Sequence, residues 1–126
     1  MITRTPRLLL GFASLLAAAG GLIHAGAFDK ALAAFAASNL HAFFGNSSKA
    51  LWLGDSATLV ILAALFGLIA ARPSAATRPV VVLLSLIPAA TAILIYAFLG
   101  GFFAGHLLMI TAGSAFLAGL RFPESS

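Results

Sequence analysis

The chain contains no cysteine, and charged side chains make up only 8% of its 126 residues. The absence of cysteine excludes disulfide bonds and thiolate metal ligands. Soluble domains carry about 25% charged residues. With 62% hydrophobic residues and a mean hydropathy of +1.12, this chain falls outside the range of soluble domains. We therefore expect one membrane domain over residues 1–126, with no room for a separate soluble catalytic module.

The sequence also lacks the motifs of several enzyme classes. The pairs Gly20-Gly21 and Gly100-Gly101 are not followed by the Lys-Ser or Lys-Thr of a phosphate-binding loop. A Ser-His-Asp arrangement could be assembled from Ser48 or Ser56, a histidine and Asp55, but neither serine lies in a nucleophile elbow. The motif inventory therefore favours a non-enzymatic protein.

Long uncharged runs are what the chain does contain. Residues 80–120 form 41 positions without a formally charged side chain, interrupted by Leu99-Gly100-Gly101. A bilayer hydrocarbon core about 30 Å thick is crossed by about 20 residues of helix. The run therefore predicts two crossings, at residues 79–98 and 102–120, folded over at the glycines. Two further crossings are predicted at residues 8–28 and 48–71.

These segments predict an all-α integral membrane protein, a four-transmembrane-helix bundle. Residues 31–46, between the first two crossings, are too polar to span and too apolar for a solvated loop. Because their apolar side chains repeat at intervals of three and four, they predict a short interfacial helix. We expect Asn46-Ser47-Ser48 to cap the crossing that follows. The repeating positions are Leu32, Phe35, Ala36, Leu40 and Phe43.

The basic residues predict the topology. Lys30 and Lys49 lie on one side of the predicted spans, whereas the other five of the seven basic residues lie on the opposite side. The positive-inside rule places the larger group in the cytoplasm. We therefore expect a multi-pass protein of a bacterial-type inner membrane with cytoplasmic N and C termini, in which the net charge of +4 orients the chain and does not indicate nucleic acid. The larger group is Arg4, Arg7, Arg72, Arg78 and Arg121.

The N-terminal segment has a second interpretation. Arg4 and Arg7, an apolar run and Ala25-Gly26-Ala27 follow one another in the order of a secretory signal peptide with its cleavage site. The uncharged run from Leu8 is longer than the about 7 to 15 residues of a signal-peptide core, and it is dense in small residues. We therefore favour a retained first crossing over cleavage after Ala27.

Small residues at intervals of four predict close helix packing. Ala17, Gly21 and Ala25 have this spacing in the first crossing, and Gly101 and Gly105 have it at the start of the fourth. Such stripes allow two helix backbones to approach, within one chain or between copies. Besides the lipid bilayer, we therefore expect a second copy of the chain or a larger membrane complex as partner.

Ionisable residues of the spans gather toward the predicted outer side. A carboxylate at the centre of a membrane helix costs about 2.5 to 3.5 kcal/mol, so Asp55 is expected to be partnered or functional. In the simpler alternative, Asp55 is an interfacial residue bonded to Ser56, Trp52 or Lys49, and each histidine is a hydrogen-bonded anchor. Tyr96 lies at the same depth, and we count Tyr96, Ser56 and Trp52 as supporting polar groups.

A metal site is the sharper interpretation of the same residues. Three imidazoles and one carboxylate are ligands for zinc, copper or non-haem iron, so a divalent metal is the cofactor that these residues suggest. No two of them have a local metal-binding spacing such as H-x-x-x-H, so only the tertiary structure could bring them together. The candidate ligands are His24, His41, Asp55 and His106.

Packing surfaces outnumber reactive groups in this sequence, which favours a non-enzymatic accessory or small-ligand-binding membrane protein with a polar pocket on the extracytoplasmic side. The alternative is a metal-binding membrane protein or enzyme that uses the His/Asp cluster. A small oligomeric transporter comes third, because transport needs an ionisable group that is reachable from both sides, and no charged residue lies in the inner half of the spans.

Overall fold

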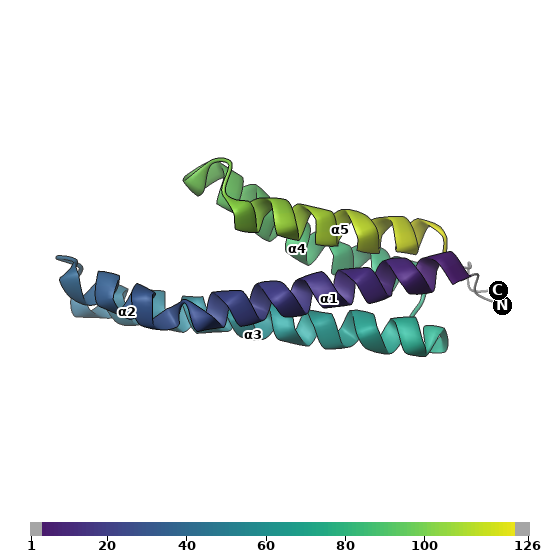
Figure 1. The fold of residues 1–126 in the computed structure, drawn as a ribbon, viewed down its shortest axis with the longest axis horizontal. Coiled ribbons are helices and arrows are strands. Elements are labelled where there is room, and N and C mark those ends of the chain that lie inside the picture. Colours follow the sequence, from purple (N-terminus) through teal and green to yellow (C-terminus); the bar gives the residue numbers. More distant parts are fainter. Residues whose placement is uncertain (1–3, 123–126) are drawn as a thin grey trace.

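The computed structural model describes residues 4–122, and helices account for nearly all of them (Figure 1). Four helices are long and apolar enough to cross a membrane: α1 (Arg4–Gly26), α3 (Ala42–Ala71), α4 (Arg78–Leu99) and α5 (Phe103–Leu120). The short helix α2 (Phe28–Ala37) lies between the first two spans, and the 3-10 turn η1 (Pro73–Ala75) joins α3 to α4. The described chain has no strand, and the predicted all-α membrane fold is confirmed.

Helices α1 and α3 are antiparallel neighbours along the length of α1 (Figure 1). Small residues of α1 make this contact close. Ala17 is fully buried, and a Cβ atom added to Gly21 would lie 3.1 Å from the carbonyl oxygen of Ser56. The predicted small-residue stripe is therefore a packing face at Ala17 and Gly21, whereas Ala25, one turn further on, is exposed.

Helices α4 and α5 form the second hairpin, and its turn lies where the glycines predict it. Gly100 has a φ of 68°, a conformation that favours glycine. Gly105 packs against α4, because a Cβ atom there would lie 2.7 Å from Cε1 of Tyr96. Gly101 lies in the turn with open space around it, so the close approaches of α5 to α4 occur at Gly105 and Gly119.

The two hairpins converge at one end, which we call the closed end. Helix α1 joins them by packing against both α3 and α5. Arg7 also ties α1 to the last turn of α3: its Nε donates to the carbonyl oxygen of Ala70 and its Nη2 to that of Ala71, each at 3.1 Å. The core at this end draws on all four spans and comprises Leu10, Ala13, Leu62, Phe66, Ile69, Val81, Ala115, Ala118 and Phe122.

At the opposite end, which we call the open end, the α4–α5 hairpin diverges from α1 and α3 (Figure 1). Helix α3 has 30 residues and is about 45 Å long, whereas the 22 residues of α4 span about 33 Å. The first turns of α3, with α2 beside them, therefore extend past the tip of the α4–α5 hairpin. We call residues 28–49 the α2–α3 extension.

The structure corrects the prediction for this region. Ala27 alone separates α1 from α2, the chain reverses after Ala37, and α3 begins at Ala42. Residues 46–48 therefore lie inside α3, and the prediction that they cap it is wrong. The cap is His41, whose Nδ1 accepts a hydrogen bond from the Phe43 N–H at 3.3 Å. The hydroxyl of Ser48 instead donates to the carbonyl oxygen of Phe44, which is typical of a serine within a helix.

Candidate functional site

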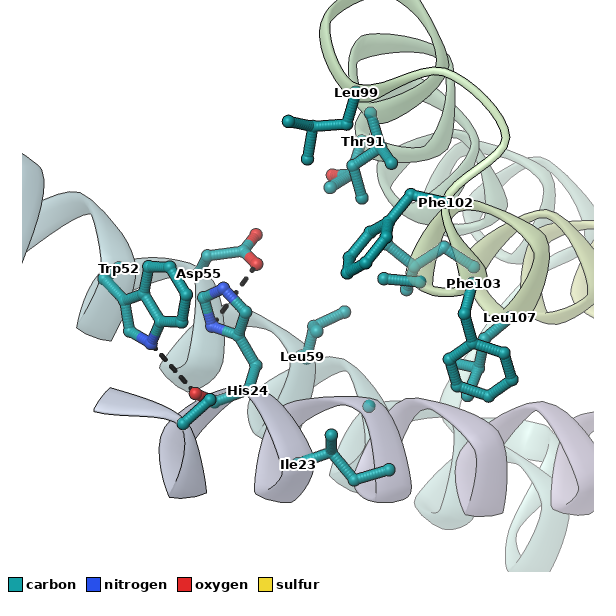
Figure 2. Close-up of a pocket in the computed structure, with 15 residues that line it drawn as sticks. Ile23, His24, Trp52, Asp55, Leu59, Thr91, Leu99, Phe102, Phe103 and Leu107 are labelled. Carbon is teal, nitrogen blue, oxygen red and sulfur yellow. Dashed lines mark hydrogen bonds and ion pairs between the residues drawn. The ribbon is translucent and has the colours of Figure 1, made fainter. Parts of the chain in front are cut away.

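A cavity of about 310 Å³ opens between the α1–α3 pair and the α4–α5 hairpin at the open end, and we call it the cleft (Figure 2). Three polar side chains line it: His24 from α1, Asp55 from α3 and Thr91 from α4. The rest of its wall is apolar apart from the edge of Trp52. The apolar side chains labelled in Figure 2 are Ile23, Leu59, Leu99, Phe102, Phe103 and Leu107.

The polar edge of the cleft is formed by the last turn of α1 and the middle of α3. His24 Nδ1 lies 2.8 Å from Ser56 Oγ and 3.9 Å from Asp55 Oδ2. The side chains of His24 and Asp55 are 28% and 37% exposed, so both reach the cleft and both are partly covered. The structure thus brings together two of the four candidate ligands, with Ser56 as a supporting group.

Ser56 lies between the two spans. Its Oγ is 2.8 Å from His24 Nδ1 and 3.2 Å from the carbonyl oxygen of Trp52, one turn back in α3. The position of the proton on the imidazole decides whether Ser56 donates to His24 or accepts from it. The contact between His24 Nδ1 and Asp55 Oδ2, at 3.9 Å, is too long for a hydrogen bond.

Trp52 holds the His24 ring in place. The two rings are stacked with centroids 4.2 Å apart and planes 14° apart, and Trp52 Nε1 donates to the carbonyl oxygen of His24 at 2.9 Å. Phe35 of α2 packs edge-on against the indole, at a centroid distance of 6.5 Å. Trp52 thus joins the end of α1 to the middle of α3 (Figure 2), and its contact with Phe35 adds α2.

The other two histidines lie elsewhere. His106 is exposed on α5, and its Nδ1 is 2.9 Å from the phenolic oxygen of Tyr96. His41 is the N-cap of α3 and lies about 21 Å along the helix axis from Asp55. Neither His41, His106 nor Tyr96 is part of the cleft wall.

The predicted four-residue metal cluster does not form. Within residues 4–122, no three His, Asp or Glu side chains lie together in a way that could hold a metal ion. Two features separate the candidates. The extra turns of α3 carry His41 away along the helix axis, and His106 lies on the face of α5 that contacts Tyr96 of α4 and not on the face that lines the cleft.

The far wall of the cleft was missed by sequence reasoning. Thr91, Phe102, Phe103 and Leu107 lie on the α4–α5 hairpin and carry no chemical motif. In a membrane helix, apolar side chains face lipid as readily as protein, so their pattern does not reveal which of them line a cavity. A glycine turn bearing two consecutive phenylalanines is the one signal in the sequence that marks this wall.

A comparison of the chain with protein-family models, with curated proteins and with solved structures finds no match. The functional argument therefore depends on the cleft and on the groups that line it.

Proposed function

We propose that this chain is a non-enzymatic membrane protein that binds a small amphiphilic ligand in the cleft. The observation that carries the proposal is the composition of the wall: an apolar cavity with one polar edge, at His24 and Asp55. Small-molecule sites in proteins have this character, with apolar linings of about 300–1,000 Å³ and a few polar groups that orient the ligand. The apolar part of the ligand would lie against the hairpin wall, and its polar part against α3.

The distribution of basic residues supports an extracytoplasmic cleft. Both α1 and α4 begin at the closed end with arginines, and both α3 and α5 end there next to arginines. The positive-inside rule makes this end cytoplasmic in a bacterial-type inner membrane. The open end, with the cleft, then lies in the outer leaflet, where a ligand dissolved in lipid can enter between the two hairpins.

Assembly with a second copy or a larger complex belongs to the same proposal. Ala25 and Gly101 are exposed near the open end, and a small side chain there allows another helix to approach closely. An accessory role would follow if such a partner received the ligand. Metal binding is not part of the proposal, because no three His, Asp or Glu side chains among residues 4–122 lie together in a way that could hold a metal ion.

The test uses the fluorescence of Trp52, the one tryptophan of the chain, which lines the cleft. Purified protein in a maltoside detergent is titrated with dodecanol brominated on its chain, a neutral quencher. We expect saturable quenching in the wild type and its loss in Thr91→Phe, which fills the cleft. Ile93→Phe introduces the same side chain at a 59% exposed position outside the cleft and is the control. Its Trp52 fluorescence should be quenched to the same extent as that of the wild type. Identical curves for the three proteins would refute the proposal.

A further inference from the structure

We infer that the ligand of the cleft carries a cationic ammonium head group, which Asp55 binds. The inference rests on the proposed function, because it assumes that the cleft holds an amphiphile. It adds the chemical class of that amphiphile, an alkylammonium.

The charge of the cleft is the first argument. Asp55 is the one carboxylate on the wall, and no lysine or arginine lines it. The nearest basic residue along α3, Lys49, donates through Nζ to Asn46 Oδ1 at 3.3 Å. Asp55 therefore carries the one formal charge among the residues that line the cleft, and this charge attracts cationic head groups and repels phosphate or carboxylate groups.

The unused hydrogen-bonding capacity of Asp55 is the second argument. An ionised carboxylate accepts up to about four hydrogen bonds. Among the described residues, no side chain lies within hydrogen-bond distance of the Asp55 carboxylate, and its one ion-pair contact is with His24 Nδ1 at 3.9 Å. Asp55 nevertheless lies within the apolar part of a membrane-spanning helix, where an unpaired carboxylate is unfavourable. An ammonium ion in the cleft would supply both the missing charge and the missing donors.

The opposite wall is the third argument. Phe102, at the tip of the α4–α5 hairpin, directs its ring into the cleft toward the side from which Asp55 projects (Figure 2). The face of an aromatic ring attracts an ammonium ion, and this attraction is strongest where water is excluded. A carboxylate on one wall and an aromatic ring on the other form a site that suits an ammonium better than a neutral hydroxyl.

Two sources can supply this chemistry: a lipophilic amine with a net positive charge, or the ammonium of a zwitterionic lipid such as phosphatidylethanolamine. The second carries a phosphate next to the ammonium, and the cleft has no basic residue to receive it. We therefore infer that the ligand is a lipophilic amine with a net positive charge.

The experiment compares three brominated probes with twelve-carbon chains in the Trp52 quenching assay: a primary alkylammonium, the alcohol and a lysophosphatidylethanolamine. In the wild type, we expect half-saturation by the ammonium probe at a concentration about tenfold lower than for the alcohol, as a charge-assisted contact implies. The lysolipid is expected to bind no better than the alcohol. If the lysolipid bound as tightly as the ammonium probe, the ligand would not have to carry a net positive charge. The ammonium group would then be that of a zwitterionic lipid.

Asp55→Asn isolates the role of the carboxylate, because asparagine keeps the size of the side chain and loses its charge. We expect the ammonium preference to disappear, so that the ammonium probe and the alcohol reach half-saturation at the same concentration, while the far-ultraviolet circular dichroism of the variant shows that it is folded. Asp29→Asn, at an exposed position on α2, is the matched control and should retain the preference.

Two results would overturn the inference: equal half-saturation by ammonium and alcohol in the wild type, or an ammonium preference that survives in Asp55→Asn. The first comparison needs no variant, so it stands even if Asp55→Asn does not fold. Absence of saturable quenching by every probe would be a different result, since it refutes the cleft as a binding site and with it the proposed function.

Discussion

The indole of Trp52 contacts His24 twice, by stacking on its imidazole at 4.2 Å and by donating Nε1–H to its carbonyl oxygen at 2.9 Å. The carbonyl oxygen of His24 also accepts from the Ala27 N–H at 3.3 Å, so the indole adds a second hydrogen bond to this acceptor at the end of α1. The same residue thereby positions a side chain of the cleft and joins two spans at the end where the hairpins diverge.

Trp52→Phe tests this junction. Phenylalanine retains a ring for stacking and removes the indole N–H, so we expect the free energy of unfolding to fall by about 1 kcal/mol, the typical value of one hydrogen bond. Thermal unfolding followed by circular dichroism in detergent measures the change. Leu51→Ala, at the adjacent and 74% exposed position, should melt like the wild type. An unchanged melting temperature for Trp52→Phe would show that the bond contributes nothing.

The α4–α5 contact depends on the small size of Gly105. A methyl group there would lie 2.7 Å from Tyr96 Cε1 and 3.1 Å from Ile95 Cγ2, so Gly105→Ala should destabilise the protein by about 1–3 kcal/mol through overpacking. Gly113, in the same helix, has open space around the added atom. Gly113→Ala should therefore leave stability unchanged or raise it, because alanine favours the helix. Equal melting temperatures for the two variants would contradict the packing argument.

The guanidinium of Arg7 caps α3 at the closed end. Arg7→Gln removes its hydrogen bonds to the carbonyl oxygens of Ala70 and Ala71, and we expect a loss of about 1 kcal/mol in the free energy of unfolding. Arg4→Gln removes the same charge from an exposed position three residues earlier and is the matched control. If both variants lose the same stability, the effect is one of charge near the membrane surface and not of the cap.

The absence of cysteine makes the topology directly measurable. Single cysteines are introduced at Asn39, in the α2–α3 extension, and at Ser74, in η1, both of which are exposed. A maleimide reagent that does not cross membranes should label Asn39→Cys in spheroplasts and Ser74→Cys only after the membrane is opened. The reverse pattern would place the cleft in the cytoplasmic leaflet.

Single residues of the cleft can be selected from the sequence, but their role there stays a prediction. Asp55 is expected to be partnered or functional because a carboxylate in a membrane helix is costly, and in the structure it lines the cleft with His24 Nδ1 3.9 Å away. Ser56 and Trp52 were predicted as supporting groups, and both contact His24. Tyr96 instead contacts His106, away from the cleft.

The errors share one cause. Residue number determines how far along a helix a side chain lies, at about 1.5 Å per residue, but it does not say which neighbouring helix that side chain faces. His106 was expected to join the cluster because its depth was right, yet its side chain contacts Tyr96 of α4, whereas Phe103 and Leu107 of the same helix line the cleft. His41 was placed in an interfacial segment, whereas α3 extends back to it and moves it beyond the cleft.

The number of spans and the turn between the last two follow from the order of residues alone. Backbone polar groups in lipid must be paired within a helix, and the length of each apolar run decides how many helices the chain can form. The cleft does not follow in this way. It depends on the angle between two hairpins, and that angle results from contacts between residues far apart in the chain. The hairpins are close where Leu10 of α1 and Ala115 of α5 share one core, and they diverge where Asp55 and Phe102 line opposite walls of the cleft.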